Sequence, residues 1–314
     1  MIKFWDGIEM KRGVYCVLQT PLNDDESINQ AEFAKEIDWL IQGGVSGLVL
    51  AMVSEVMRFS ADERRFQWKL AIDLVKGRVP LIISVGAEST VIATKLATLA
   101  EQDGASALMA TPPAIFPATA DEIFNYYSSI IEATQLPVIV QDASNYMGKP
   151  LGLELYEDLL KSYGTDRVQF KPEARPVKER AAALQKIANG KAKIFEGQSG
   201  ADLLETHPIG VVGTMPGSEI PWAIIKLWSA LENNNTEKAI EIHSVISKLL
   251  TFQPRIDSYV AVEKYLLLKQ GIFSSTRQRG PVSEILSATQ KSEIDIVFEE
   301  LVKVTDYRGV GNSN

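Results

Sequence analysis

The chain has 314 residues, 46% of them hydrophobic, and a formal net charge of −8 at pH 7. Its length and apolar content are sufficient for a large globular core. Because the charge is acidic and no basic cluster is interleaved with aromatic residues, nucleic acids and anionic membranes are excluded as expected partners.

The sequence contains one cysteine, Cys16, and two histidines, His207 and His243. A single cysteine cannot build a disulfide framework, which fits a cytoplasmic location. We also expect no signal peptide, because the first residues lack a long apolar core, and no later run reaches a membrane-spanning length. Because thiol and imidazole groups are so few, we do not expect a metal site. Catalysis would then come from other side chains or from a carbonyl-reactive group.

Short aliphatic runs alternate with longer amphipathic segments over the first two thirds of the chain. Each run is apolar on both faces, as parallel strands covered by helices require. We predict strands over 14–18, 47–51, 80–85, 105–110, 136–141, 168–171, 192–195 and 209–213. Helices are predicted over 29–42, from the capping-box residue Ser60 to Val75, over 90–103, from about Ala120 onward, and over 201–205.

Eight strands with helices between them predict a closed (β/α)₈ TIM barrel. After residue 220 the pattern becomes entirely helical, with helices predicted over 222–232, 236–250, 257–269 and 282–304. We therefore expect a barrel over residues 1–219 and a C-terminal helical extension over 220–314, packed on the outside of the barrel.

The sixth predicted strand carries a lysine where its apolar character ends. Pro172 stops further pairing, so Lys171 is expected at a strand end. Alternation of side chains places Gln169, Lys171 and Glu173 on one face, which is the inner face if the sheet closes, and Phe170 on the other. Burial would disfavour the ammonium form, and a neutral amine can attack a ketone to form an imine. The alternative is a lysine that points into solvent, which is the common case for charged groups.

The loops that follow the strands of such a barrel build its active site, so the other strand ends supply further candidates. After the second strand, Ser54 could donate its hydroxyl, and the backbone at Val53 could hold a carboxylate. Ser54 could equally cap a turn. Gln141 ends the fifth strand, and Gln198 and Met215 follow the seventh and eighth.

With these residues in place, the chain resembles the dihydrodipicolinate synthase and N-acetylneuraminate lyase family of Schiff-base-forming (β/α)₈ enzymes, over roughly residues 13–304. The resemblance is carried by Thr20-Pro21-Leu22, Gly43-Gly44-Val45, Ser54-Glu55, Asp62-Glu63-Arg64, Val79-Pro80, Ser84-Val85-Gly86, Asp103-Gly104-Ala105, Thr111-Pro112-Pro113, Leu136-Pro137, Phe170-Lys171 and Arg279-Gly280-Pro281. It implies that Lys171 forms an imine with the ketone of pyruvate or a longer 2-oxo acid, with no cofactor besides this imine. It also implies a homotetramer or homodimer.

Several positions depart from the family pattern. Gln141 stands where the family has a catalytic tyrosine, Met52 and Val53 replace paired threonines, Ser54 replaces a glycine, Ala114 replaces a loop tyrosine, and Tyr146 replaces an arginine that would hold a semialdehyde carboxylate. An amide can form hydrogen bonds but cannot titrate, whereas condensation and carbon–carbon cleavage need a group that moves protons. Dihydrodipicolinate synthase activity is therefore not expected.

Dehydration of a 2-oxo acid requires a base for the C3 proton and departure of the C4 hydroxyl. Glu173, two residues beyond Lys171, is the candidate base or acid, unless it pairs with Arg175 or Lys178 at the rim. The pattern resembles the family branch of 2-keto-3-deoxy sugar acid dehydratases, such as those acting on L-2-keto-3-deoxyarabonate. In this hypothesis Gln141 orients the substrate, Ser54 and the backbone at Val53 hold its carboxylate, and Gln198 and Met215 line the pocket. The alternatives are a synthase or pyruvate-dependent aldolase of the same family, and a barrel that binds a 2-oxo acid without catalysis.

Overall fold

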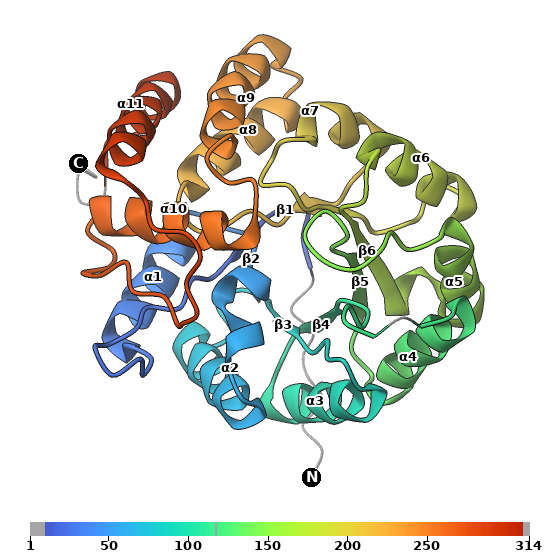
Figure 1. Cartoon of the computed structure of the whole chain (residues 1–314). Coiled ribbons are helices and arrows are strands. Elements are labelled where there is room, and N and C mark those ends of the chain that lie inside the picture. Colours follow the sequence, from blue (N-terminus) through green and yellow to red (C-terminus); the bar gives the residue numbers. More distant parts are fainter. Residues whose placement is uncertain (1–9, 117, 310–314) are drawn as a thin grey trace.

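Eight parallel strands form a ring that helices surround (Figure 1). The computed structural model describes residues 10–116 and 118–309. The strands are β1 (Gly13–Val17), β2 (Gly47–Leu50), β3 (Leu81–Ser84), β4 (Ala107–Ala110), β5 (Val138–Asp142), β6 (Val168–Pro172), β7 (Phe195–Glu196) and β8 (Gly213–Thr214). Their order is β6-β5-β4-β3-β2-β1-β8-β7. A parallel bridge between Phe170 and Ile194 joins the two ends, so the predicted (β/α)₈ barrel is confirmed.

Both faces of the sheet are buried, which explains the continuous apolar character of the strands. Side chains that point into the ring pack on one another, among them Tyr15, Val49, Ile82, Met109 and Ile139. The alternate side chains point outward and pack against the surrounding helices in one large core. Among the described residues, the inward-pointing side chains pack the interior of the ring, and a cavity lies where the strands end.

The helices that alternate with the strands are α1 (Gln30–Gln42), α2 (Ala61–Val75), α3 (Thr90–Asp103), α4 (Ala120–Glu132), α5 (Leu153–Arg167), α6 (Val177–Ile187), α7 (Leu203–Thr206) and α8 (Pro221–Glu232). Two of their starts follow directly from the sequence. Asn29 caps α1 by accepting a hydrogen bond from the Glu32 N–H, and Ser60 and Glu63 form the predicted capping box of α2.

Three further helices follow, α9 (Thr236–Leu250), α10 (Ile256–Lys269) and α11 (Ala288–Thr305). Helix α8 packs against β1 and against α9, and α9 packs against α11 (Figure 1). The division at residue 219 stays a prediction, although α8 contacts the strands as a barrel helix does. Helix α10 lies against η1 (Met52–Ser54), the turn that follows β2, and this contact brings it to the cavity.

Three predicted elements differ clearly from those observed, the first being the strand predicted over 192–195, which is β7 at Phe195–Glu196. The strand predicted over 209–213 is β8 at Gly213–Thr214, because Ile209 ends the turn η3 (His207–Ile209) and Gly210 follows in the left-handed region, with φ 95°. The helix predicted over 282–304 begins at Ala288 instead. Ser287 caps it and Gln290 completes the capping box.

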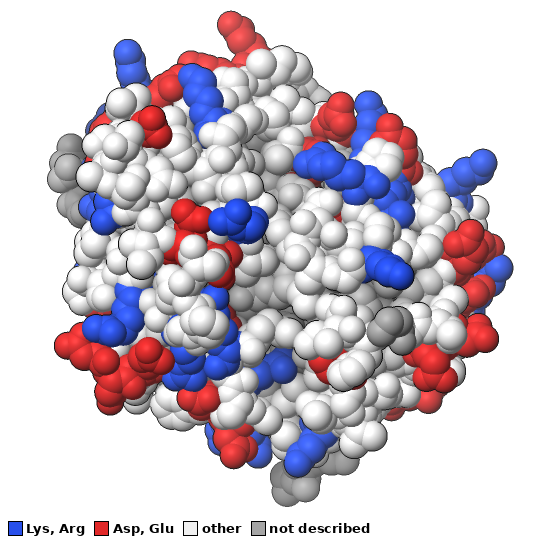
Figure 2. All heavy atoms as spheres, viewed as in Figure 1, with Lys and Arg blue, Asp and Glu red and all other residues white. Residues whose placement is uncertain are grey.

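The face shown in Figure 2 has acidic and basic side chains interspersed, most of them toward the perimeter. Among the residues coloured there, no continuous basic patch of the kind that binds nucleic acid is present. Within residues 10–116 and 118–309, none of the helices has the length and apolarity needed to cross a bilayer.

Candidate active site

A cavity with an empty volume of about 390 Å³ lies at the carboxyl ends of the strands and is partly open to solvent. It is lined by Val17, Ala51, Met52, Val53, Gln141, Tyr146, Lys171, Glu173, Gly197, Ser199, Met215, Gly217, Ile256, Tyr259 and Glu263. Six strands (β1, β2, β5, β6, β7 and β8) or the loops that follow them contribute lining residues, and α10 contributes one wall. This is the end of the barrel at which enzymes of this fold carry out their chemistry.

Lys171 lies near the end of β6 and is only 4% exposed. The alternative of a solvent-directed lysine is therefore wrong. The expected alternation is confirmed, because the Phe170 ring points outward and packs on Tyr156 of α5, with the ring centroids 5.0 Å apart. Lys171 and Glu173 both line the cavity on the inner side.

The Lys171 amine lies next to a carboxylate that it shares with Gln141. Lys171 Nζ is 3.4 Å from Glu173 Oε1, and Gln141 Nε2 donates to Glu173 Oε2 at 2.7 Å. Burial raises the pKa of Glu173, and the Lys171 charge and the Gln141 hydrogen bond oppose this shift. The carboxyl group is thus placed to take up or release a proton beside the amine.

The interpretation of Glu173 as a rim ion pair is wrong. Arg175 pairs with Asp202 at 3.3 Å, and Lys178 lies 4.0 Å from Glu205, so neither cation is paired with Glu173. Glu173 is instead 1% exposed, inside the cavity.

Gly197, which follows β7, allows these two side chains to occupy their positions. A Cβ at Gly197 would lie 2.7 Å from Glu173 Cγ and 2.8 Å from Lys171 Cε. Both distances are shorter than carbon atoms tolerate, so any side chain at this position would displace the lysine or the carboxylate.

The predicted substrate-binding residues differ in whether they line the cavity. Val53 and Met215 line the cavity. The Ser54 hydroxyl is buried and donates to the Leu18 carbonyl at 2.5 Å, while it accepts from the Ala51 N–H at 3.1 Å. These contacts fit the alternative in which Ser54 caps a turn. The predicted contact between Ser54 and a substrate carboxylate stays a prediction.

Gln198 is held at the edge of the cavity by a tyrosine. Its Oε1 accepts a hydrogen bond from the Tyr146 hydroxyl at 3.1 Å, while its neighbours Gly197 and Ser199 line the cavity. Its backbone N–H is bonded to the buried Glu196 carboxylate at 2.7 Å, which fixes the loop after β7. The predicted role of Gln198 in the pocket stays a prediction.

The contribution of α10 to the cavity was not predicted from the sequence. Ile256, Tyr259 and Glu263 lie on one face of this helix and line the cavity. Their spacing of three and four residues, with two polar groups on an otherwise apolar face, is the signal that could have found them. The Tyr259 ring packs edge-on against Tyr146, with centroids 5.9 Å apart, so two phenols reach the cavity although Gln141 replaces the expected tyrosine.

The family model described as Dihydrodipicolinate synthetase family matches residues 10–299. The chain belongs to the dihydrodipicolinate synthetase family. This confirms the resemblance seen in the sequence and makes the protein an enzyme of a family of lyases. The comparisons therefore support an enzyme and not a barrel without catalytic activity.

Named members of the dihydrodipicolinate synthetase family are similar to this chain at modest identity. The chain is 27% identical over 282 residues to L-2-keto-3-deoxyarabonate dehydratase of Azospirillum brasilense, covering 87% of this chain and 89% of that protein. It is 27% identical to 4-hydroxy-tetrahydrodipicolinate synthase of Rhizobium meliloti, covering 91% and 97%.

Solved structures of the same family share the fold. A 4-hydroxy-tetrahydrodipicolinate synthase from Methylacidiphilum fumariolicum superposes with a TM-score of 0.84 at 20% identity, covering 94% of this chain and 98% of that one. A prophage protein from E. coli K12, solved in complex with pyruvate, has a TM-score of 0.82 at 21% identity, covering 92% and 98%. At these identities the likeness concerns the fold.

The described part of the chain contains no group of three or more His, Cys, Asp or Glu side chains placed to hold a metal ion. The polar side chains that line the cavity carry an amine, two carboxyl groups, two phenols, the Gln141 amide and the Ser199 hydroxyl. Such a set can attack a carbonyl and move protons.

Proposed function

We propose that this enzyme dehydrates a 2-keto-3-deoxy sugar acid through an imine formed with Lys171. The observation that carries the proposal is the pairing of a buried amine and a buried carboxyl group, 3.4 Å apart, in one cavity. The similarity to L-2-keto-3-deoxyarabonate dehydratase supports the substrate class, and the E. coli protein solved with pyruvate supports a 2-oxo acid.

In the proposed reaction the Lys171 amine attacks the C2 ketone, and loss of water gives a protonated imine. The imine withdraws electrons from C3, so Glu173 can remove a C3 proton to give an enamine. The enamine then expels the C4 hydroxyl, and the imine is restored with a new double bond between C3 and C4. Hydrolysis of this imine releases the product and returns the Lys171 amine.

Gln141 serves this chemistry by holding the base. Its amide donates a hydrogen bond to Glu173 Oε2 at 2.7 Å, and Glu173 Oε1 is left facing the Lys171 amine. Since an amide does not titrate, Gln141 keeps Glu173 in position without competing for the proton. The backbone at Val53, with Ser54, is proposed to bind the substrate carboxylate.

The second candidate is an aldolase or synthase on the same scaffold. It is favoured by the phenols of Tyr146 and Tyr259, which line the cavity and could move protons to and from an alkoxide. Burial raises the pKa of both phenols, that of Tyr146 more strongly. Because a raised pKa keeps the phenols neutral, they can donate hydrogen bonds but do not readily lose a proton to act as bases. The aldolase or synthase is therefore the second candidate.

A panel of 2-keto-3-deoxy acids, with products identified by mass spectrometry, tests the proposal. The expected product is the dehydrated acid or its semialdehyde tautomer, without pyruvate, and the Lys171→Met variant should form neither. Release of pyruvate from these acids would instead establish the aldolase candidate.

Assembly as a homodimer or homotetramer and a cytoplasmic location stay predictions. Light scattering would check the first of them.

A further inference from the structure

Three buried acids meet beside the cavity without a cation paired to any of them in the described structure. Glu36 lies on α1, Glu219 follows β8, and Glu263 lies on α10, and each is at most 1% exposed. Their partners are uncharged. Glu36 Oε1 accepts from the Gln19 N–H at 2.8 Å and from the Ser218 hydroxyl at 2.6 Å.

The other two acids are bonded to side-chain amides. The Gln19 amide donates to Glu263 Oε2, and the Gln253 amide donates to Glu219 Oε1 at 3.3 Å. The remaining oxygens, Glu263 Oε1 and Glu219 Oε2, are buried and have no hydrogen-bond partner. Both lie against Gly217, 2.4 Å and 2.5 Å from the position that a Cβ would take there.

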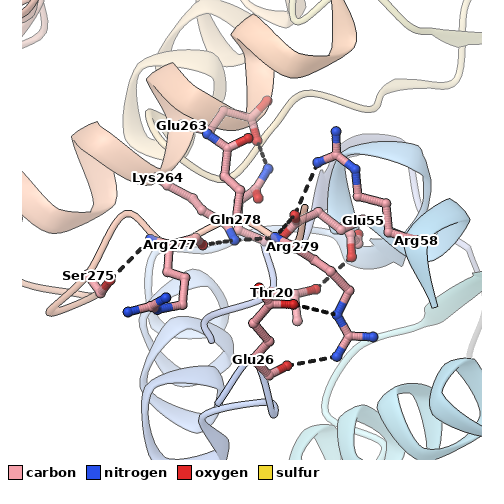
Figure 3. Close-up of polar contacts among 12 residues, drawn as sticks. Thr20, Glu26, Glu55, Arg58, Glu263, Lys264, Ser275, Arg277, Gln278 and Arg279 are labelled. Carbon is pink, nitrogen blue, oxygen red and sulfur yellow. Dashed lines mark hydrogen bonds and ion pairs between the residues drawn. The ribbon is translucent and has the colours of Figure 1, made fainter. Parts of the chain in front are cut away.

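Two carboxyl groups that approach each other in this way cannot both be ionised, and the stable arrangement keeps a proton on one of them. The cation nearest along α10 opposes this only from a distance and forms no ion pair with them among the described residues. Lys264 leaves the helix in a different direction from Glu263 and bonds to Glu55 at 2.6 Å (Figure 3). Burial raises the pKa of Glu219 to about 6, and burial together with the Glu219 charge raises the pKa of Glu263 well above its usual value.

Of the three acids, Glu263 is the one that lines the cavity. It stands on the α10 wall, which packs on the turn η1 after β2, whereas Lys171 and Glu173 stand at the end of β6. The Glu263 carboxyl group itself lies against Gln19, just after β1, and Gly217, just after β8, and these strands are three and two places from β6 around the ring. A substrate held at Lys171 can therefore extend across the cavity from the base Glu173 toward a neutral carboxylic acid.

We propose that Glu263 is a further catalytic residue, a carboxylic acid that gives its proton to the hydroxyl group leaving C4 of the substrate. This inference rests on the proposed dehydration. In the step, the C4–O bond breaks with its electron pair on oxygen, and the proton from Glu263 makes the leaving group water. The enamine electrons form the C3–C4 double bond and the nitrogen regains its double bond to C2, so nothing is oxidised or reduced. Glu263 is left as a carboxylate and regains a proton from solvent before the next turnover.

The Glu263→Gln variant of the full chain separates this role from a structural one. Glutamine keeps an oxygen for the Gln19 hydrogen bond but has no acidic proton. We expect dehydration of the hydroxy acid to fall by about 10²- to 10⁴-fold. Borohydride trapping of pyruvate at Lys171 and deuterium exchange at C3 should persist, because both precede departure of the hydroxyl.

A substrate whose leaving group needs no proton makes the test specific. With a 4-fluoro-2-oxo acid, fluoride release by Glu263→Gln should stay within about threefold of the unchanged enzyme, since general-acid assistance is then dispensable. Equal losses with the hydroxy and fluoro substrates, or no loss with either, would overturn the proposal. Glu36→Gln is the matched control, because it removes a buried acid of the same cluster that does not line the cavity, and both rates should be retained.

Two measurements on the unchanged enzyme keep the result interpretable. Deuterated solvent should slow dehydration of the hydroxy acid at the step of hydroxyl departure but not fluoride release, whether or not Glu263→Gln folds. Identical solvent effects would contradict the role of Glu263. If the unchanged enzyme forms pyruvate from the hydroxy acid, the proposed dehydration itself fails, and this outcome is distinct from dehydration that does not depend on Glu263.

Discussion

Lys264 Nζ lies 2.6 Å from Glu55 Oε2, and both side chains are fully buried. Glu55 Oε1 also accepts from the Arg279 N–H at 2.8 Å, and Lys264 donates to the Arg277 carbonyl at 2.6 Å (Figure 3). The pair therefore joins α10, the turn after β2 and the segment around residues 277–279. Since Met52 and Val53 on that turn and Glu263 on α10 all line the cavity, this ion pair fixes the distance between two of its walls.

Removing one member of this pair should destabilise the protein. Lys264→Met removes the nearer cation from the buried Glu55 carboxylate and leaves only Arg58, 3.4 Å from Glu55 Oε1. The expected loss is at most about 3–5 kcal/mol in the free energy of unfolding. Urea denaturation measures it, and adding Glu55→Gln should restore part of the loss. Lys248→Met is the control, because its partner Glu300 is exposed and such pairs contribute less than about 1 kcal/mol. If Lys264→Met and Lys248→Met lose similar amounts of unfolding free energy, burial does not strengthen the Lys264–Glu55 ion pair.

Gly197→Ala should impair catalysis more than folding. The added methyl group would press on Glu173 and Lys171 and separate the amine from the carboxylate. We expect turnover to fall by at least about tenfold, because catalytic groups displaced by even one ångström lose much of their effect. Gly280→Ala, where a Cβ would meet nothing within 4 Å, should retain activity. Steady-state kinetics of both variants decides the matter, and unchanged turnover in Gly197→Ala would show that the two groups need not lie this close.

Replacing Glu173 by glutamine should slow turnover while leaving imine formation intact. The neutral amide cannot remove the C3 proton, so turnover should fall by about 10²- to 10⁴-fold. Borohydride trapping with pyruvate should still label Lys171. Deuterium exchange at C3 of pyruvate gives a direct measure of the missing step, and exchange at the normal rate would remove Glu173 from the mechanism.

The Gln141→Leu variant should shift the pH dependence of catalysis. The hydrogen bond from Gln141 lowers the pKa of Glu173, so its loss raises that pKa. A base must be ionised to act, and activity therefore rises as pH increases through its pKa. The acidic limb of the kcat/KM profile should move to higher pH in Gln141→Leu. A limb that stays in place would mean that another group controls it.

Glu36 should make the protein less stable as pH rises. Burial raises the pKa of Glu36 to about 8 from an ordinary value near 4.5. The folded state thus binds more protons than the unfolded state between these values, and stability falls as pH increases through that range. Glu36→Gln removes the effect, which is at most about 5 kcal/mol since one pKa unit corresponds to about 1.4 kcal/mol. Denaturation at pH 5 and pH 8 should show a smaller difference in the variant, and an equal difference would contradict the assignment.

The barrel and the centre of its site were accessible from sequence because they depend on local patterns. Apolar runs on both faces predict buried parallel strands, and alternation along β6 places Lys171 and Glu173 on the inner face. Gln141 was predicted at the end of the fifth strand, and parallel strands end at the same edge of a sheet. The observed register pairs Gln141 with Lys171 directly.

The α10 wall could not be predicted in the same way. Tyr259 and Glu263 are far from the strand ends in sequence, and only the packing of α10 on η1 brings them to the cavity. The Ser54 hydroxyl similarly depends on tertiary structure, because its acceptor is the Leu18 carbonyl beyond β1. A pattern of residue types does not reveal that a hydroxyl is already engaged by the backbone.

The central claim is that Lys171 forms an imine with a 2-oxo acid, and reductive trapping measures this most directly. Incubation with pyruvate and borohydride, followed by peptide mass spectrometry, should show one added pyruvate-derived group on the peptide that contains Lys171. The Lys171→Met variant should show none. An unmodified Lys171, or a label on a different lysine, would contradict the account.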